Sequence, residues 1–94
     1  MNLTEEVQRG RDAEQLLANP ILTNAYDVFE QSILDKFKTE RMSGESLDEL
    51  QMMLFCLYEV KQQITKAVDT GKMAVIQLER ETKVAEFKAK NKFA

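Results

Sequence analysis

Residues 47–78, which read LDELQMMLFCLYEVKQQITKAVDTGKMAVIQL, decide the fold of this protein. Apolar side chains recur in this stretch at alternating intervals of three and four residues, the heptad pattern of a helix that packs along another helix. The pattern predicts one long helix from about residue 47 to residue 88. We call its apolar positions the seam: Leu47, Leu50, Leu54, Leu57, Ile64, Val68, Val75 and Leu78, with Lys61 and Gly71 in the same register.

Gly71 is the point at which this helix could end. The spacing passes through Gly71 unchanged, and a helix that stopped and restarted there would have no reason to keep its phase. A glycine inside a helix costs about 1 kcal/mol relative to alanine. We therefore favour a continuous helix, with at most a bend at Gly71. The alternative is a C-cap at this glycine, followed by a separate helix.

A second apolar line follows the same helix. Its members are Met53, Cys56, Val60, Ala67, Met73, Ile76, Val84 and Phe87. One seam would be enough for a two-stranded coil, so two apolar faces predict packing against the protein's own chain and also against another chain. Which of the two covers the seam stays open at this point. We expect Cys56 to be buried as a free thiol and the methionines to fill the core, and the alternative for the methionines is an adaptable contact surface.

Capping residues mark two shorter helices before residue 47. Asn2 has a glutamate three residues later, as in a capping box, and begins a helix over residues 3–18. Asn19 and Pro20 end that helix and start the next, because proline disfavours a helical conformation in the residue before it and is tolerated at a first helical position. The second helix is expected over residues 20–40.

A turn at residues 42–45 separates the second helix from the long one. Ser46, with a glutamate three residues later, is expected to cap the long helix. Residues 89–94 are expected to fray. The sequence therefore predicts a single all-α domain over residues 1–94. Its expected architecture is a helical hairpin or three-helix arrangement with one long C-terminal helix, associating as a coiled-coil-like oligomer.

The composition excludes most enzyme chemistry. The chain of 94 residues has no histidine, one cysteine and three glycines. It therefore lacks an imidazole general base, histidine zinc ligands, an intramolecular disulfide and a glycine-rich phosphate loop. We predict no catalytic residue, no metal site and no cofactor. The longest apolar run, residues 52–58, is far below the ~20 residues needed to cross a bilayer, so we expect no membrane partner and a cytoplasmic location.

Charge is distributed unevenly along the chain. Residues 1–70 hold 7 Lys and Arg against 13 Asp and Glu, whereas residues 71–94 hold 6 against 3. The simpler interpretation of the basic end is a solvated helix terminus whose cations suit the helix dipole. The alternative is a docking tail for an acidic protein surface or for phosphates. Its residues would be Lys83, Phe87, Lys88, Lys90, Lys92 and Phe93.

Nucleic-acid binding has only weak support. The first two helices could form a helix-turn-helix, but the second offers no Lys or Arg before Lys36 with which to read a major groove. The body of the chain is also acidic, which opposes binding to a duplex. A DNA-binding role therefore stays a minor alternative.

The order of these elements resembles a group of phage proteins. The segments that carry the resemblance are Leu16-Leu17-Ala18-Asn19-Pro20-Ile21-Leu22, Val68-Asp69-Thr70-Gly71-Lys72-Met73-Ala74 and Gln77-Leu78-Glu79. The chain is similar over most of its length to small all-helical proteins that tailed bacteriophages and prophages encode near their head and DNA-packaging genes. The resemblance implies a role in virion assembly or packaging, including association with the virion, and transfers no catalytic or binding residue.

Three functions follow as hypotheses. The first is a non-enzymatic phage protein that acts in head assembly or DNA packaging as a homo-oligomer. The second is a DNA-packaging component similar to a small terminase subunit, although the chain lacks the basic helix-turn-helix of those proteins. The third is a small helical protein that binds and inhibits a host enzyme. In each case the expected partner is a second copy, another phage protein or a host protein.

Overall fold

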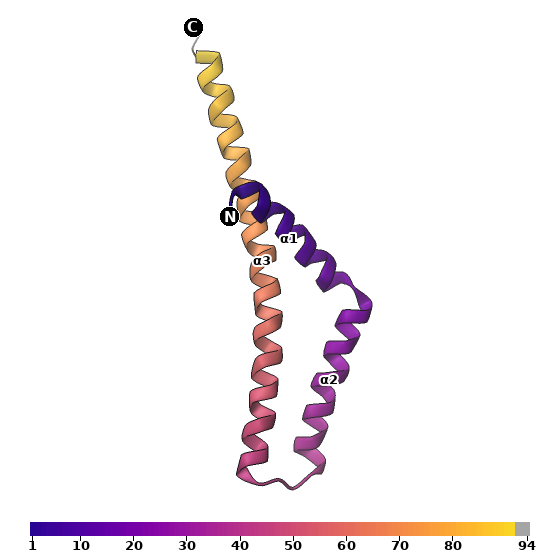
Figure 1. Ribbon diagram of the computed structural model, residues 1–94. Helices are drawn as coiled ribbons and strands as arrows, with labels where there is room; N and C mark the ends of the chain where they lie inside the picture. The colour runs from indigo at the N-terminus through magenta and orange to yellow at the C-terminus, as the bar shows by residue number, and fades with distance from the viewer. Residues whose placement is uncertain (92–94) are drawn as a thin grey trace.

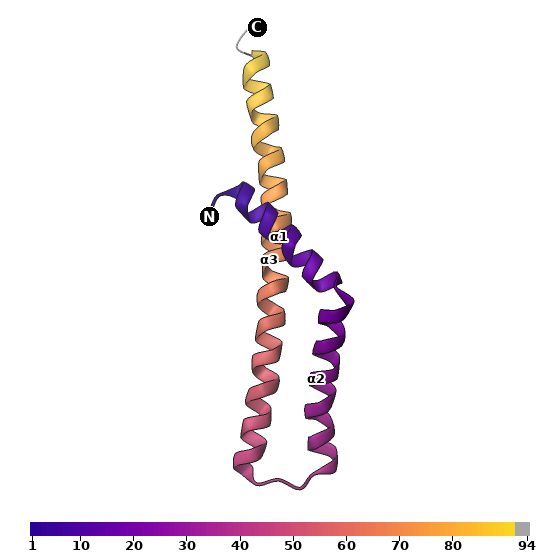
Figure 2. The ribbon, with the colours of Figure 1, turned by 45° about the vertical axis from the view of Figure 1, so that its right-hand side comes forward.

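The protein is an elongated assembly of three helices in the computed structural model, which describes residues 1–91 (Figure 1). The helices are α1 (Leu3–Ala18), α2 (Pro20–Thr39) and α3 (Gly44–Asn91), and residues 1–91 contain no strand. The all-α prediction is confirmed. α2 and the first half of α3 run antiparallel as a hairpin, and α1 crosses α3 obliquely near its middle (Figures 1 and 2). The molecule measures 78 × 26 × 18 Å.

The caps of α1 and α2 are formed by the two expected asparagines. Asn2 Oδ1 accepts a hydrogen bond from the Glu5 backbone N–H at 2.8 Å. Asn19 Oδ1 accepts from the backbone N–H groups of Ile21 at 2.9 Å and Leu22 at 3.4 Å. Each side chain thus satisfies N–H groups that have no partner within the first turn of a helix. α1 has its expected bounds, and α2 ends one residue earlier than expected.

The predicted cap of α3 was wrong by one turn. Ser43 Oγ, and not the hydroxyl of Ser46, accepts at the start of the helix, from the Ser46 backbone N–H at 3.3 Å. Ser43 stands three residues before Ser46, so the same serine-capping chemistry acts one turn earlier. Gly44 consequently becomes the first residue of α3 instead of part of the turn.

α3 is one helix of 48 residues that passes through Gly71 without a break. This confirms the continuous helix and excludes a C-cap at Gly71. Residues 89–91, expected in a frayed tail, belong to the helix, because nothing in the sequence up to Asn91 breaks it. Residues 92–94 lie outside the described residues. At 1.5 Å per residue the helix is about 72 Å long, so it sets the length of the molecule.

Two glycines form the crossing of α1 and α3. A Cβ atom added to Gly71 would lie 2.8 Å from Gly10 Cα and 3.1 Å from the Glu6 carbonyl oxygen. A Cβ atom on Gly10 would meet Gly71 Cα at the same distance. No glycine among residues 1–91 has a positive φ. Gly10 and Gly71 are therefore required by the close approach of two backbones and not by an unusual backbone conformation.

Small side chains continue the crossing on both sides of the glycines. Ala13 of α1 and Ala74 of α3 are buried, together with Val7 and Val68. At the edge, Lys72 Nζ lies 3.7 Å from Glu14 Oε1, with both side chains exposed. Such an exposed ion pair contributes about 0–1 kcal/mol, so apolar packing holds α1 on α3.

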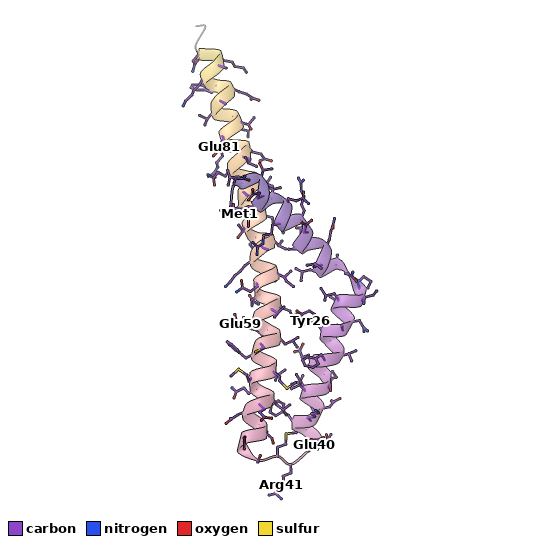
Figure 3. All side chains as sticks on the ribbon, in the orientation of Figure 1. Met1, Tyr26, Glu40, Arg41, Glu59 and Glu81 are labelled. Atoms are coloured by element: carbon purple, nitrogen blue, oxygen red, sulfur yellow. The ribbon has the colours of Figure 1, made fainter. Side chains whose placement is uncertain are left out.

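The α2–α3 hairpin is more open than the crossing. Ile33 is the one buried residue of α2, and Leu50 is its buried counterpart on α3. Further along, Tyr26 projects from α2 toward α3, where Lys61 Nζ lies 5.5 Å from the centre of its ring (Figure 3). Lys61 occupies a seam position and is half-buried. The aromatic ring explains how a cation is accommodated there.

Candidate interaction surface

The seam faces α1 and α2 of the same chain. Leu50 and Val68 are buried. Half-buried are Leu54, Leu57, Ile64, Val75 and Leu78, while Leu47 at the first end is exposed. A repeat of 3.5 residues drifts by about 20° per heptad around a straight helix of 3.6 residues per turn, and Leu47 at the first end accordingly leaves the buried face. The seam thus supplies the packing inside one chain.

Cys56 and the methionines do not lie where the sequence analysis placed them. Cys56 is exposed, and so are Met52, Met53 and Met73. Because α2 approaches α3 on one side only, Cys56 and these methionines stay open to solvent. The expectation of a buried thiol and methionine-filled core was therefore wrong.

Part of the second apolar line of α3 forms an open apolar groove. Its volume is about 300 Å³, and it is lined by Phe29, Met52, Met53, Cys56, Leu57 and Val60. Phe29 is the contribution of α2, and the other lining residues belong to α3. The groove contains no charged side chain, so it can accept only an apolar group from another molecule.

A straight stripe of six large apolar and four polar residues runs along the side of α3 opposite Gly71. Each residue turns the helix by 100°, so between Phe55 and Phe87 ten positions fall within about 40° of the line that runs along the helix opposite Gly71. We call these positions the outer stripe: Phe55, Tyr58, Gln62, Lys66, Asp69, Met73, Ile76, Arg80, Val84 and Phe87. Their mean spacing is close to 3.6 residues, so the stripe does not drift, and it extends over about 48 Å.

The large apolar members of the outer stripe are in open contact with solvent. Their exposed fractions lie between 43% and 66%, and they are Phe55, Tyr58, Met73, Ile76, Val84 and Phe87. The second apolar line had identified four of these residues. Phe55 and Tyr58 were missed, although they continue the intervals of three and four residues towards the start of the helix.

The last part of α3 extends beyond α1 and α2. Every residue from Glu81 to Asn91 is exposed, and their side chains stand free in Figure 3. Of the predicted docking tail, Lys83, Phe87, Lys88 and Lys90 lie on this segment, whereas Lys92 and Phe93 are outside the described residues. Most helical stability in proteins comes from packing against other elements, so a partner would stabilise this segment.

Metal binding and membrane crossing have no counterpart in the described part of the chain. Residues 1–91 contain no group of three or more side chains that could hold a metal ion. None of the three helices combines the length and the apolar character needed to cross a membrane.

Comparison of the chain with protein-family models, with curated proteins and with solved structures finds no match.

Proposed function

We propose that this protein is a non-enzymatic assembly protein that acts by self-association through the outer stripe. The observation that carries the proposal is the set of six large apolar side chains exposed on one straight face of α3. These side chains form three apolar clusters along the stripe, separated by its polar residues, and exposed apolar clusters rimmed by polar residues mark surfaces that another molecule covers. The resemblance to small phage proteins suggests head assembly or DNA packaging in the host cytoplasm as the setting.

The surface area of a single chain supports association. The accessible surface is 7617 Å², whereas a compact monomer of this mass exposes about 5,600 Å². The radius of gyration of 21.6 Å likewise exceeds the ~12 Å of a compact chain of this length. The excess of roughly 2,000 Å² is of the size that permanent interfaces bury.

The two alternative functions receive less support. The exposed cations of the last turns, Lys83, Lys88 and Lys90, alternate with Glu81 and Glu86. This alternation lowers the positive potential that a packaging component similar to a small terminase would need for DNA. An inhibitor of a host enzyme would use the same exposed apolar residues. A chain that stays monomeric alone would favour that alternative.

Sedimentation velocity tests the proposal. At tens of micromolar, the natural protein should sediment at no less than twice the chain mass of 10.9 kDa. The variant Met73→Asp with Phe87→Asp should be monomeric and remain helical by circular dichroism, because both side chains are exposed. Leu57 and Ile64 are unsuitable for this test, since they are half-buried within the chain.

The matched control changes two equally exposed apolar residues outside the stripe. Ile21 and Val28 lie on α2 and are at least as open to solvent as most of the stripe. Ile21→Asp with Val28→Asp should leave the oligomer intact. A natural protein that is monomeric would refute the proposal, and dissociation by the control alone would assign association to α2.

A further inference from the structure

We propose that the apolar groove between α2 and α3 binds a short cationic amphipathic helix of a partner protein. The groove lies on a different side of α3 from the outer stripe, because the line through Cys56 is turned by about 120° from the centre of the stripe. A second copy on the stripe therefore leaves the groove free. This binding site goes beyond the proposed self-association and does not require it.

The lining of the groove suits apolar anchors of a helix. Phe29, Met53 and Val60 keep between 41% and 49% of their surface exposed. The lining positions of α3 extend from residue 52 to residue 60, about 12 Å or two helical turns. Methionine side chains are unbranched and adapt to the shape of what they contact. The groove can thus receive two apolar residues that are three or four positions apart on a docked helix.

The lining also favours a helix over an extended segment. Apart from the thiol of Cys56, which is a weak hydrogen-bonding group, every lining side chain is apolar. An extended segment would leave backbone N–H and C=O groups without partners in such a groove, and that is costly. A helix satisfies these groups internally, so only its side chains need to fit.

Carboxylates flank the groove on α3. Rotation by about 100° per residue places two of them within about 20° of the line through Cys56, before the groove begins. Two more lie within about 40° of the line through Met52, along the edge away from α2. The four residues are Glu45, Glu49, Asp48 and Glu59. They are all the charged residues between positions 44 and 60, so this part of α3 is purely acidic.

α2 adds one cation to this side of the hairpin. Lys36 lies within about 20° of the line through Phe29, whereas Lys38 is on the opposite side of α2. Lys61 of α3 is directed toward the ring of Tyr26. Four carboxylates against one cation leave the rim acidic, which attracts a partner with Lys or Arg beside its apolar anchors and repels an acidic one.

Protection of the Cys56 thiol tests the proposal in the natural protein. Cys56 is the one cysteine of the chain, it lines the groove, and it is exposed. The probe is a helical peptide of about 14 residues with leucine at i, i+3, i+4 and i+7 and lysine elsewhere. At ten times its Kd this peptide should slow alkylation by iodoacetamide about tenfold. The matched peptide with glutamate in place of lysine should not slow it.

Two variants with the same change in charge separate groove binding from general attraction. Met53→Asp with Val60→Asp places two carboxylates in the groove and should weaken binding of the lysine peptide at least about tenfold, because an apolar anchor would then bury them. Met73→Asp with Phe87→Asp, on the outer stripe, should not weaken it. Charge attraction alone would tighten binding to both variants. Fluorescence anisotropy of the labelled peptide gives the Kd, and circular dichroism checks that each variant is helical.

A second pair of variants tests the acidic rim. Glu45→Gln with Glu49→Gln should weaken binding of the lysine peptide about two- to tenfold and reduce its salt dependence. Glu79→Gln with Glu86→Gln is the control, because it removes two exposed carboxylates far along α3 from the groove. The control should leave the Kd within the error of the measurement.

The possible outcomes separate the two proposals. Equal protection by both peptides would mean that the groove does not select a cationic partner, and binding without protection of Cys56 would place the peptide elsewhere. Either result, or the absence of binding, overturns this inference and leaves self-association in place. Slow alkylation of the natural protein that Met73→Asp with Phe87→Asp accelerates would assign the groove to a second copy and would also overturn it. A monomeric natural protein that binds the lysine peptide would refute the proposed self-association alone.

Discussion

The α1–α3 crossing and the α2–α3 hairpin use the same long helix but opposite kinds of side chain. At the crossing, Gly10 and Gly71 bring the two backbones into contact, and the neighbouring Ala13 and Ala74 are buried. In the hairpin, large side chains such as Phe29 lie beside α3 and stay exposed. Small residues therefore complete an interface within the chain, whereas large residues leave apolar surface for another molecule.

The largest expected effect concerns the hairpin. Ile33 is 2% exposed, and Ile33→Ala should lower the free energy of unfolding by about 2–4 kcal/mol because it leaves a cavity against α3. Ile21, on the same helix, is 80% exposed, and Ile21→Ala should change the free energy of unfolding by less than about 0.5 kcal/mol. Urea unfolding gives both values. The protein concentration must be the same for both variants, because association also contributes to stability. Equal effects would mean that α2 does not pack on α3 in solution.

The second prediction tests the crossing. Gly71→Ala gains about 1 kcal/mol of helix propensity, but its Cβ would clash with the Gly10 backbone, and overpacking of this kind costs about 1–3 kcal/mol. We expect a net loss from Gly71→Ala and from Gly10→Ala in thermal unfolding. Gly44→Ala is the control, because a Cβ there meets nothing within 4 Å. Gly44→Ala should cause no loss of stability.

The double variant Gly10→Ala with Gly71→Ala sharpens this test. Either substitution alone displaces α1 from α3, so the two together should cost less than the sum of the single effects. A gain in stability from Gly71→Ala would contradict the close crossing, since helix propensity alone would then be acting.

The smallest expected effect lies at the junction between the two regions. Asn19→Ala removes the side-chain oxygen that accepts from Ile21 and Leu22, and should cost about 1 kcal/mol of unfolding free energy. Asn24, inside α2 and exposed, is the control, because Asn24→Ala should be neutral or slightly stabilising. If the two alanine variants proved equally stable, Asn19 would not hold the start of α2.

The helices themselves could be predicted because their signals are local. The asparagine caps, the position of Pro20 and the unbroken heptad phase each involve residues within a turn or two of one another. The cap of α3 was misplaced because Ser43 and Ser46 offer the same hydroxyl three residues apart. The glutamate three residues after Ser46 favoured that serine in the sequence, whereas the structure starts α3 at Gly44, after Ser43.

The interaction surface could be predicted only in part. The second apolar line on α3 correctly indicated that one neighbour would not cover the whole helix. The sequence could not show that Cys56 and Met53 would be exposed, since their burial depends on where α2 lies. Phe55 and Tyr58 could be assigned to the outer stripe only after the buried side of α3 was known. The position of α1 and α2 decides which side of α3 is exposed.

The sequence by itself determined an all-α chain with a continuous third helix, since propensity, capping and periodicity are properties of neighbouring residues. The tertiary structure alone decided what the glycines do. In the sequence Gly71 is a defect in a heptad seam, and Gly10 is a weak point in a short helix. In the structure the two glycines pack against each other, and a Cβ atom added to either one would lie 2.8 Å from the Cα atom of the other. The lack of a side chain matters only where a second backbone comes this close, and the sequence does not show where that happens.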